Sequence, residues 1–147
     1  MEKRKIWLYC SLTILIITLV LIVSGSSLLS LTLDQNESIP LGTFITWFGI
    51  ISLHLSIYLS LNRPKNLSKT ILKKLMPILK SLLILAILWM PICYLLAGNL
   101  SFTFTDKIEF QGGQLAMKWF WRFTYGIVIA PIIILIFYWI LSLFRKN

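Results

Sequence analysis

The chain of 147 residues is 58% hydrophobic and has a mean hydropathy of +0.86, while only 13% of its residues are charged, about half the share found in soluble domains. Its formal net charge is +9, but the basic residues flank apolar runs instead of forming the separate basic face that nucleic-acid binding requires. These totals exclude a soluble globular domain and a nucleic-acid-binding protein, and they predict an all-α membrane protein.

Four apolar runs reach or approach the roughly 20 residues that a helix needs to cross a bilayer. They cover residues 6–31, 43–61, 81–98 and 123–144. The first run follows a Lys-Arg-Lys start, as a signal peptide would, but it is too long for the apolar part of one and lacks an Ala-x-Ala-like cleavage site. We therefore expect it to be retained, and residues 1–147 to form a single domain of four transmembrane helices.

The basic residues are distributed unevenly around these runs. All of them lie before the first run, between the second and third, or after the fourth, except Lys107, Lys118 and Arg122. The acidic residues other than Glu2 lie in the two remaining loops. The positive-inside rule then places both termini in the cytoplasm, and we expect a multi-pass protein of the bacterial inner membrane. The basic loops should also bind anionic lipids of the inner leaflet.

The basic segment between the second and third runs, "NRPKNLSKTILKKLMPILK", has helical periodicity. Its apolar residues recur every three or four positions with lysines largely between them, and Ser68 is suited to cap the helix. We expect an amphipathic helix on the lipid surface that leads into the third run, with Pro77 as its bend. The alternative is a helix that docks a partner protein. Pro91 and Pro131 should kink the third and fourth runs, as prolines do in membrane helices.

The segment before the fourth run, "LSFTFTDKIEFQGGQLAMKWFWRF", alternates apolar and polar residues. A period of two predicts a half-buried strand, and Gly112-Gly113 offers a two-residue turn. We therefore predict a small outer β-hairpin at residues 101–121, packed on the membrane surface or on the outer helix ends. In the competing interpretation, residues 114–121 are the first turns of the fourth helix.

The polar face of this predicted hairpin is a candidate partner-binding surface. A passive linker requires neither regular alternation nor a paired-glycine turn, so the pattern suggests recognition or capping of the bundle. The candidate partner-binding residues are Thr103, Thr105, Lys107 and Glu109.

Ionisable residues at membrane depth mark catalytic and transport sites, because burying them in lipid is costly. The four runs contain no Asp, Glu, Lys or Arg, and His54 is the sole candidate. It could bind haem alone, relay protons or gate a pore; we expect instead a neutral imidazole hydrogen-bonded between helices, with Tyr58 as a nearby partner. Two cysteines and one histidine cannot close a metal site. We therefore expect no enzyme activity, no cofactor and no metal.

Small residues recur on two of the runs, and small residues let helices approach closely in lipid. These candidate helix-packing residues are Gly49, Ser52, Ser56 and Ser60 in the second run, and Gly126 and Ala130 in the fourth. We expect them to pack helices within the bundle. The alternative is contact with a partner or with a second copy in a homo-oligomer.

The layout resembles that of immunity proteins against channel-forming colicins, which are small inner-membrane proteins with four helices and cytoplasmic termini. In the group that protects against colicins A, B and N, a basic loop joins helices two and three, and a Thr-rich outer segment precedes helix four. The similar stretches here are "LNRPKNLSKTILKK" and "LSFTFTDKIEF", and the resemblance covers the architecture of most of the chain. It implies a protein that binds an incoming pore domain within the membrane and blocks its opening.

Two other functions fit the same pattern. One is a membrane-depolarising effector of a phage-exclusion or abortive-infection system, which is an antiviral defence. The other is an accessory subunit of a larger membrane complex. All three functions use helix surfaces and the outer segment, and in the first and third the partner is another membrane-inserted protein.

Overall fold

The computed structural model describes residues 2–33, 39–61, 69–100, 104 and 110–144. These residues form helices and, apart from one isolated bridge between Thr32 and Pro40, no strand. In chain order the elements are α1 (Glu2–Val23), the short 3-10 helix η1 (Ser27–Ser30), α2 (Leu41–Leu61), α3 (Lys69–Ile87), α4 (Trp89–Ala97) and α5 (Gly113–Phe144).

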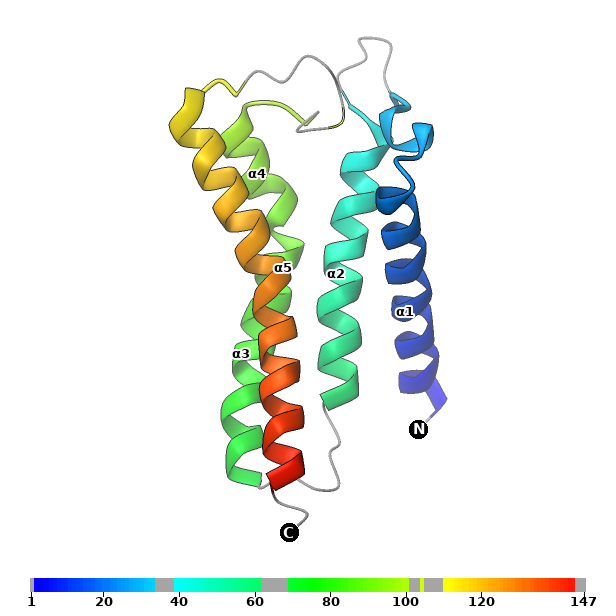
Figure 1. Ribbon diagram of the computed structural model, residues 1–147, viewed down its shortest axis with the longest axis vertical. Helices are drawn as coiled ribbons and strands as arrows, with labels where there is room; N and C mark the ends of the chain where they lie inside the picture. The colour runs from blue at the N-terminus through cyan, green and yellow to red at the C-terminus, as the bar shows by residue number, and fades with distance from the viewer. Residues whose placement is uncertain (1, 34–38, 62–68, 101–103, 105–109, 145–147) are drawn as a thin grey trace.

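The helices form an elongated bundle with α2 at its centre (Figure 1). α1 packs along one side of α2, and α3, α4 and α5 form a group on the other side. Both chain ends lie at the same end of the bundle, as an even number of membrane crossings requires (Figure 1).

Three of the helices are long and apolar enough to cross a membrane by themselves: α1, α2 and α5. A fourth crossing is made if residues Leu75–Ile87 of α3 and all of α4 count as one bent span. The fold is therefore all-α and compatible with a multi-pass membrane protein. α1 ends at Val23, short of the predicted limit at residue 31, because Gly25 turns the chain with a φ of 60° into η1.

The bend predicted at Pro91 is present, whereas α3 is not interrupted at Pro77. α3 continues as a helix through Pro77, so the basic segment runs without interruption into the third span. The axis instead turns by 49° between α3 and α4, at Leu88. Pro91 accounts for this position, because a proline ring clashes with the carbonyl four residues earlier, which is that of Ile87.

The structure does not support the predicted outer β-hairpin. Its second arm is helical, because α5 begins at Gly113, and this agrees with the competing interpretation of residues 114–121. Gly113 turns the chain into this helix with a φ of 64°, and its N–H donates to the Phe110 carbonyl at 2.8 Å. The first arm, except for Phe104, lies outside the described residues.

Aromatic contacts at helical spacing fix the first turns of α5. The rings of Trp121 and Tyr125 stack at 5.3 Å, and the Arg122 guanidinium lies 5.5 Å from the centre of the Trp119 ring. Such pairs, three or four residues apart, face each other only on a helix. Phe120 faces inward, is 2% exposed, and meets the Phe110 ring edge to face.

The core lies between α2 and the α3–α5 group. Its larger cluster joins these helices through seven buried residues: Ile50, Ala86, Trp89, Cys93, Ala97, Phe120 and Ile127. A smaller cluster of Ile57, Leu61 and Leu79 lies closer to the chain ends. Trp89 also donates its indole N–H to the Thr124 hydroxyl at 3.1 Å, which joins α4 to α5.

Topology can be measured directly with reporter fusions. Reporters inserted after Lys65 and Asn147 should be cytoplasmic, and reporters near Glu37 and Gly112 should lie outside, because the basic residues are held on the inner side. Paired alkaline phosphatase and fluorescent protein fusions give the readout. A cytoplasmic reporter at Gly112 would contradict this topology.

Candidate functional site

The polar side chains of α2 that face the α3–α5 group reach backbone carbonyls at the end of α3 and just after α4. Thr43 donates its hydroxyl to the Leu100 carbonyl at 2.6 Å, and Trp47 donates its indole N–H to the Ile87 carbonyl at 3.1 Å. His54 follows Trp47 by seven residues, which is two helical turns, so the two side chains lie on the same face. These three residues define the polar face of α2.

The hydrogen bond from Trp47 supplies a donor to the carbonyl left unpaired at the break between α3 and α4. In an uninterrupted helix the Ile87 carbonyl would accept the N–H of residue 91, but that residue is a proline and has no N–H. The Trp47 indole supplies the missing donor from the neighbouring helix. A freed carbonyl at membrane depth needs such a partner, because lipid offers no donor.

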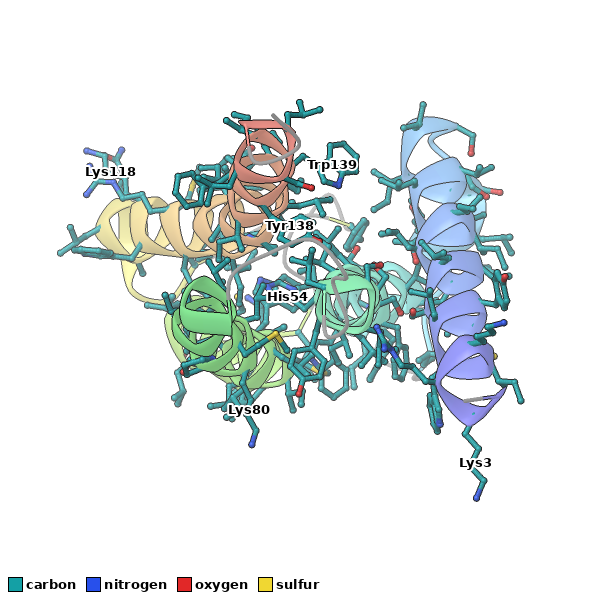
Figure 2. The ribbon with its side chains drawn as sticks, turned by 90° about the horizontal axis from the view of Figure 1, so that it is seen from below. Lys3, His54, Lys80, Lys118, Tyr138 and Trp139 are labelled. Atoms are coloured by element: carbon teal, nitrogen blue, oxygen red, sulfur yellow. The ribbon has the colours of Figure 1, made fainter. Side chains whose placement is uncertain are left out.

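His54 occupies the equivalent position opposite α5. Pro131 has no N–H, so the Ile127 carbonyl also loses its donor within the helix. That carbonyl approaches the His54 imidazole, which points into the space enclosed by α2 and the α3–α5 group (Figure 2). The ring is 1% exposed.

The hydrogen bonds of His54 differ from those the sequence suggested. Nδ1 lies 2.8 Å from the Ile50 carbonyl of the same helix, so the partner is not Tyr58. Because a carbonyl only accepts, Nδ1 carries the proton in this contact. Nε2 has no hydrogen-bond partner among the described residues, although the Ile127 carbonyl lies nearby.

The opposite side of α2 is joined to α1. The Thr18 hydroxyl donates to the Ile45 carbonyl at 3.3 Å. Arg4 donates through Nε to the Leu59 carbonyl at 3.0 Å, near the end of α2, where backbone carbonyls lack partners within the helix. Here again a side chain on one helix pairs with the main chain of the next.

The candidate helix-packing residues do not all lie at helix contacts. Gly49 is buried against Thr18 of α1, and a Cβ built at this glycine would lie 2.4 Å from the Thr18 methyl. Ser52 and Ser56 are also buried. Gly126, by contrast, is exposed with open space around it, and Ala130 is half-buried.

The remaining candidates are separate from this polar face or outside the described residues. Thr103, Thr105, Lys107 and Glu109 all fall outside them. Cys10 is exposed on α1 and Cys93 is buried on α4, and both thiols are free. Within the described part of the chain, no three His, Cys, Asp or Glu side chains are grouped so that they could hold a metal.

Sequence reasoning singled out His54 but missed Arg4, Thr18, Thr43 and Trp47. One signal was available for the contacts of Trp47 and His54. Each proline in a predicted span marks a carbonyl four residues earlier that needs a donor from elsewhere. The donors themselves could not be assigned, because which helix faces that carbonyl depends on tertiary packing.

No family model, no curated protein and no solved structure matches this chain.

The contact between Gly49 and Thr18 predicts opposite effects for two Gly→Ala substitutions. Gly49→Ala should lower the stability by about 1–3 kcal/mol, because the new methyl overlaps Thr18 and separates α1 from α2. Gly126→Ala meets open space and should be neutral or slightly stabilising. Thermal unfolding of the purified protein in detergent, followed by circular dichroism, compares the two. Equal stability of both variants would contradict the contact.

Trp47→Phe tests the bond that closes the helix break. It keeps the aromatic ring but leaves the Ile87 carbonyl without its donor, so we expect a loss of about 1 kcal/mol. The matched control is Phe48→Leu, because the neighbouring Phe48 is 53% exposed. The same unfolding assay applies, and a Trp47→Phe protein as stable as the control would show that the bond contributes nothing.

Proposed function

We propose that this protein acts without catalysis, by binding another membrane-inserted protein through its helix surfaces and its outer segment. The specific function we propose is immunity to a pore-forming bacteriocin in the bacterial inner membrane. The colicin-immunity layout of the sequence motivates this choice. The four predicted spans also lack acidic and basic side chains, which is what binding, rather than chemistry or ion coupling, requires.

The observation that carries the proposal is the large apolar surface left uncovered by the fold. In the most apolar stretches of α1 and α5 only 11% of the residues are buried inside the molecule, against 39% for α2. Two of the long helices therefore offer most of their surface to lipid or to a partner. Such surfaces suit an inhibitor that must intercept helices inserting from the outside.

The outward face of α5 is the part best shaped for a partner helix. It carries large exposed side chains on both sides of Gly126, among them Tyr125, Ile129 and Ile133. Because Gly126 is exposed with open space around it, a second helix could approach closely there. A Cβ built at Gly126 would meet nothing within 4 Å among the described residues.

The length of α5 brings its start to the outer surface. Its 32 residues extend about 48 Å at 1.5 Å per residue, against about 30 Å for the hydrocarbon core. The first turns, with Lys118, Trp119 and Arg122, therefore extend into the outer interface. The segment before them, which holds Thr103 to Glu109, would meet a bacteriocin as it arrives.

Charge at the opposite end fits a contact with anionic lipids. Lys3 and Lys80 are exposed and point away from the helices (Figure 2). Lysines with this orientation can extend to lipid head groups of the inner leaflet. This contact would orient the bundle and leave the outer segment free for the partner.

The recognition role of the outer segment is tested by changing its polar residues. Thr103→Ala and Thr105→Ala, combined with Lys107→Glu and Glu109→Lys, should reduce protection against a pore-forming colicin by about tenfold or more, as loss of a binding hot spot does. Cells expressing each variant are challenged with colicins A, B and N, and protein levels are compared by immunoblot. Lys118→Gln is the control, because Lys118 is an exposed base on the same side.

Two results would contradict the immunity proposal. If the intact protein gives no protection against any pore-forming bacteriocin tested, its partner belongs to another class. If its expression alone depolarises cells, measured with a voltage-sensitive dye, it is the effector of a defence system. Protection that survives the four changes would retain the proposal but place recognition on the helix surfaces.

A further inference from the structure

His54 and the carbonyl that Pro131 frees on α5 form a pair of groups that does not fit together when the ring is neutral. Nδ1 already donates to the Ile50 carbonyl, so in a neutral imidazole Nε2 carries a lone pair and no hydrogen. The Ile127 carbonyl that approaches the ring is also an acceptor. Two acceptors facing each other in a buried site leave both without a hydrogen bond.

A proton on Nε2 removes this mismatch. The imidazolium ion has two N–H donors, and the structure offers it two carbonyl acceptors, that of Ile50 on α2 and that of Ile127 on α5. Hydrogen bonds from a charged donor are stronger than those between neutral groups. The side chains of Ile50 and Ile127 belong to the same core cluster, which packs α2 against α5 next to the ring.

We propose that His54 Nε2 and the Ile127 carbonyl form a proton-binding site, in which uptake of one proton from water joins α2 to α5. The proton adds to the Nε2 lone pair, and the resulting N–H donates to Ile127. The contact between the two helices then depends on pH and strengthens as the pH falls. This site is independent of any bacteriocin partner.

The surroundings place few other titratable groups at the site. The two core clusters that include the neighbouring residues Ile50 and Ile57 contain the Cys93 thiol on α4 and the hydroxyls of Tyr58 on α2 and Tyr138 on α5. Residues 6–33, 41–61, 81–98 and 123–144 contain no Asp, Glu, Lys or Arg. The two carbonyls are therefore the groups available to stabilise the charged ring, and they must offset the cost of burying its charge in the core.

The chain has one histidine, so a histidine label reports this site alone. We would prepare the full-length protein in lipid bilayers with 15N-histidine and 13C-carbonyl isoleucine, and record solid-state NMR spectra as the pH is lowered. We expect the unprotonated Nε2 resonance to disappear. As that resonance disappears, a hydrogen-bonded contact between Nε2 and the Ile127 carbonyl should appear. The contact of Nδ1 with the Ile50 carbonyl should persist.

Two proline variants separate this site from general effects on the bundle. Pro131→Ala restores an N–H that competes for the Ile127 carbonyl, so the midpoint of the pH transition should fall by about one unit, a tenfold weaker binding of the proton. Pro91→Ala restores the corresponding N–H at Ile87, which Trp47 occupies, and should leave the midpoint unchanged. Both changes suit a helix interior, because alanine favours a helix where proline does not.

Two outcomes overturn the proposal. In one, Nε2 stays unprotonated throughout the pH range in which the protein remains folded, and His54 is then a neutral structural residue. In the other, Pro131→Ala and Pro91→Ala leave the same midpoint as the unchanged protein, and the ring then titrates without the Ile127 carbonyl.

Discussion

The hydrogen bond from a side chain of one helix to a backbone carbonyl of the next is the interaction on which this bundle depends. In lipid the hydrophobic effect does not hold helices together, so packing and polar contacts must do so. α1 donates to α2 through Arg4 and Thr18. α2 donates through Trp47 to the last residue of α3, Ile87, and through Thr43 to Leu100 just after α4. The chain is thus joined in sequence order, with α2 as acceptor on one side and donor on the other.

Two prolines create the points at which α2 engages the later helices. Pro91 and Pro131 each leave a carbonyl without its donor, at Ile87 and Ile127. Trp47 and His54 lie two turns apart on α2, and each faces one of these carbonyls. Trp47 donates to the Ile87 carbonyl at any pH, because an indole N–H does not titrate. The His54 ring already donates through Nδ1 to Ile50, so Nε2 can donate to the Ile127 carbonyl only when the ring carries a second proton. The proposed contact of His54 with α5 would therefore respond to pH, whereas that of Trp47 would not.

The sequence sufficed for the all-α class and for helices long and apolar enough to cross a membrane, which number three, or four if the bent pair of α3 and α4 is one span. The reason is that twenty apolar residues in lipid have only the helix open to them. The sequence failed for the outer hairpin. In "KWFWRF" three consecutive aromatic residues match a period of two and a helical period equally well, and the glycine pair before them suits a turn as well as a helix start. The packing of Phe120 against Phe110 decides for the helix, and a contact across a loop is not visible in local periodicity. The prolines were informative only in part. The kink expected at Pro91 coincides with the break between α3 and α4, whereas the helix continues through Pro77, and the sequence alone does not distinguish the two prolines.

Residue types could be predicted as candidates, but their partners could not. The small-residue stripes on α2 and α5 look alike in the sequence, yet Gly49 is buried against α1 while Gly126 faces outward. The difference comes from the position of α2 at the centre, where helices lie on both sides, whereas α5 lies at the edge. A glycine at the centre is needed for the fold itself. At the edge, a side chain in place of Gly126 would meet open space among the described residues, so the packing seen here does not require a glycine. An outward small residue on an edge helix therefore fits the proposed partner binding better than a small residue that the core already uses.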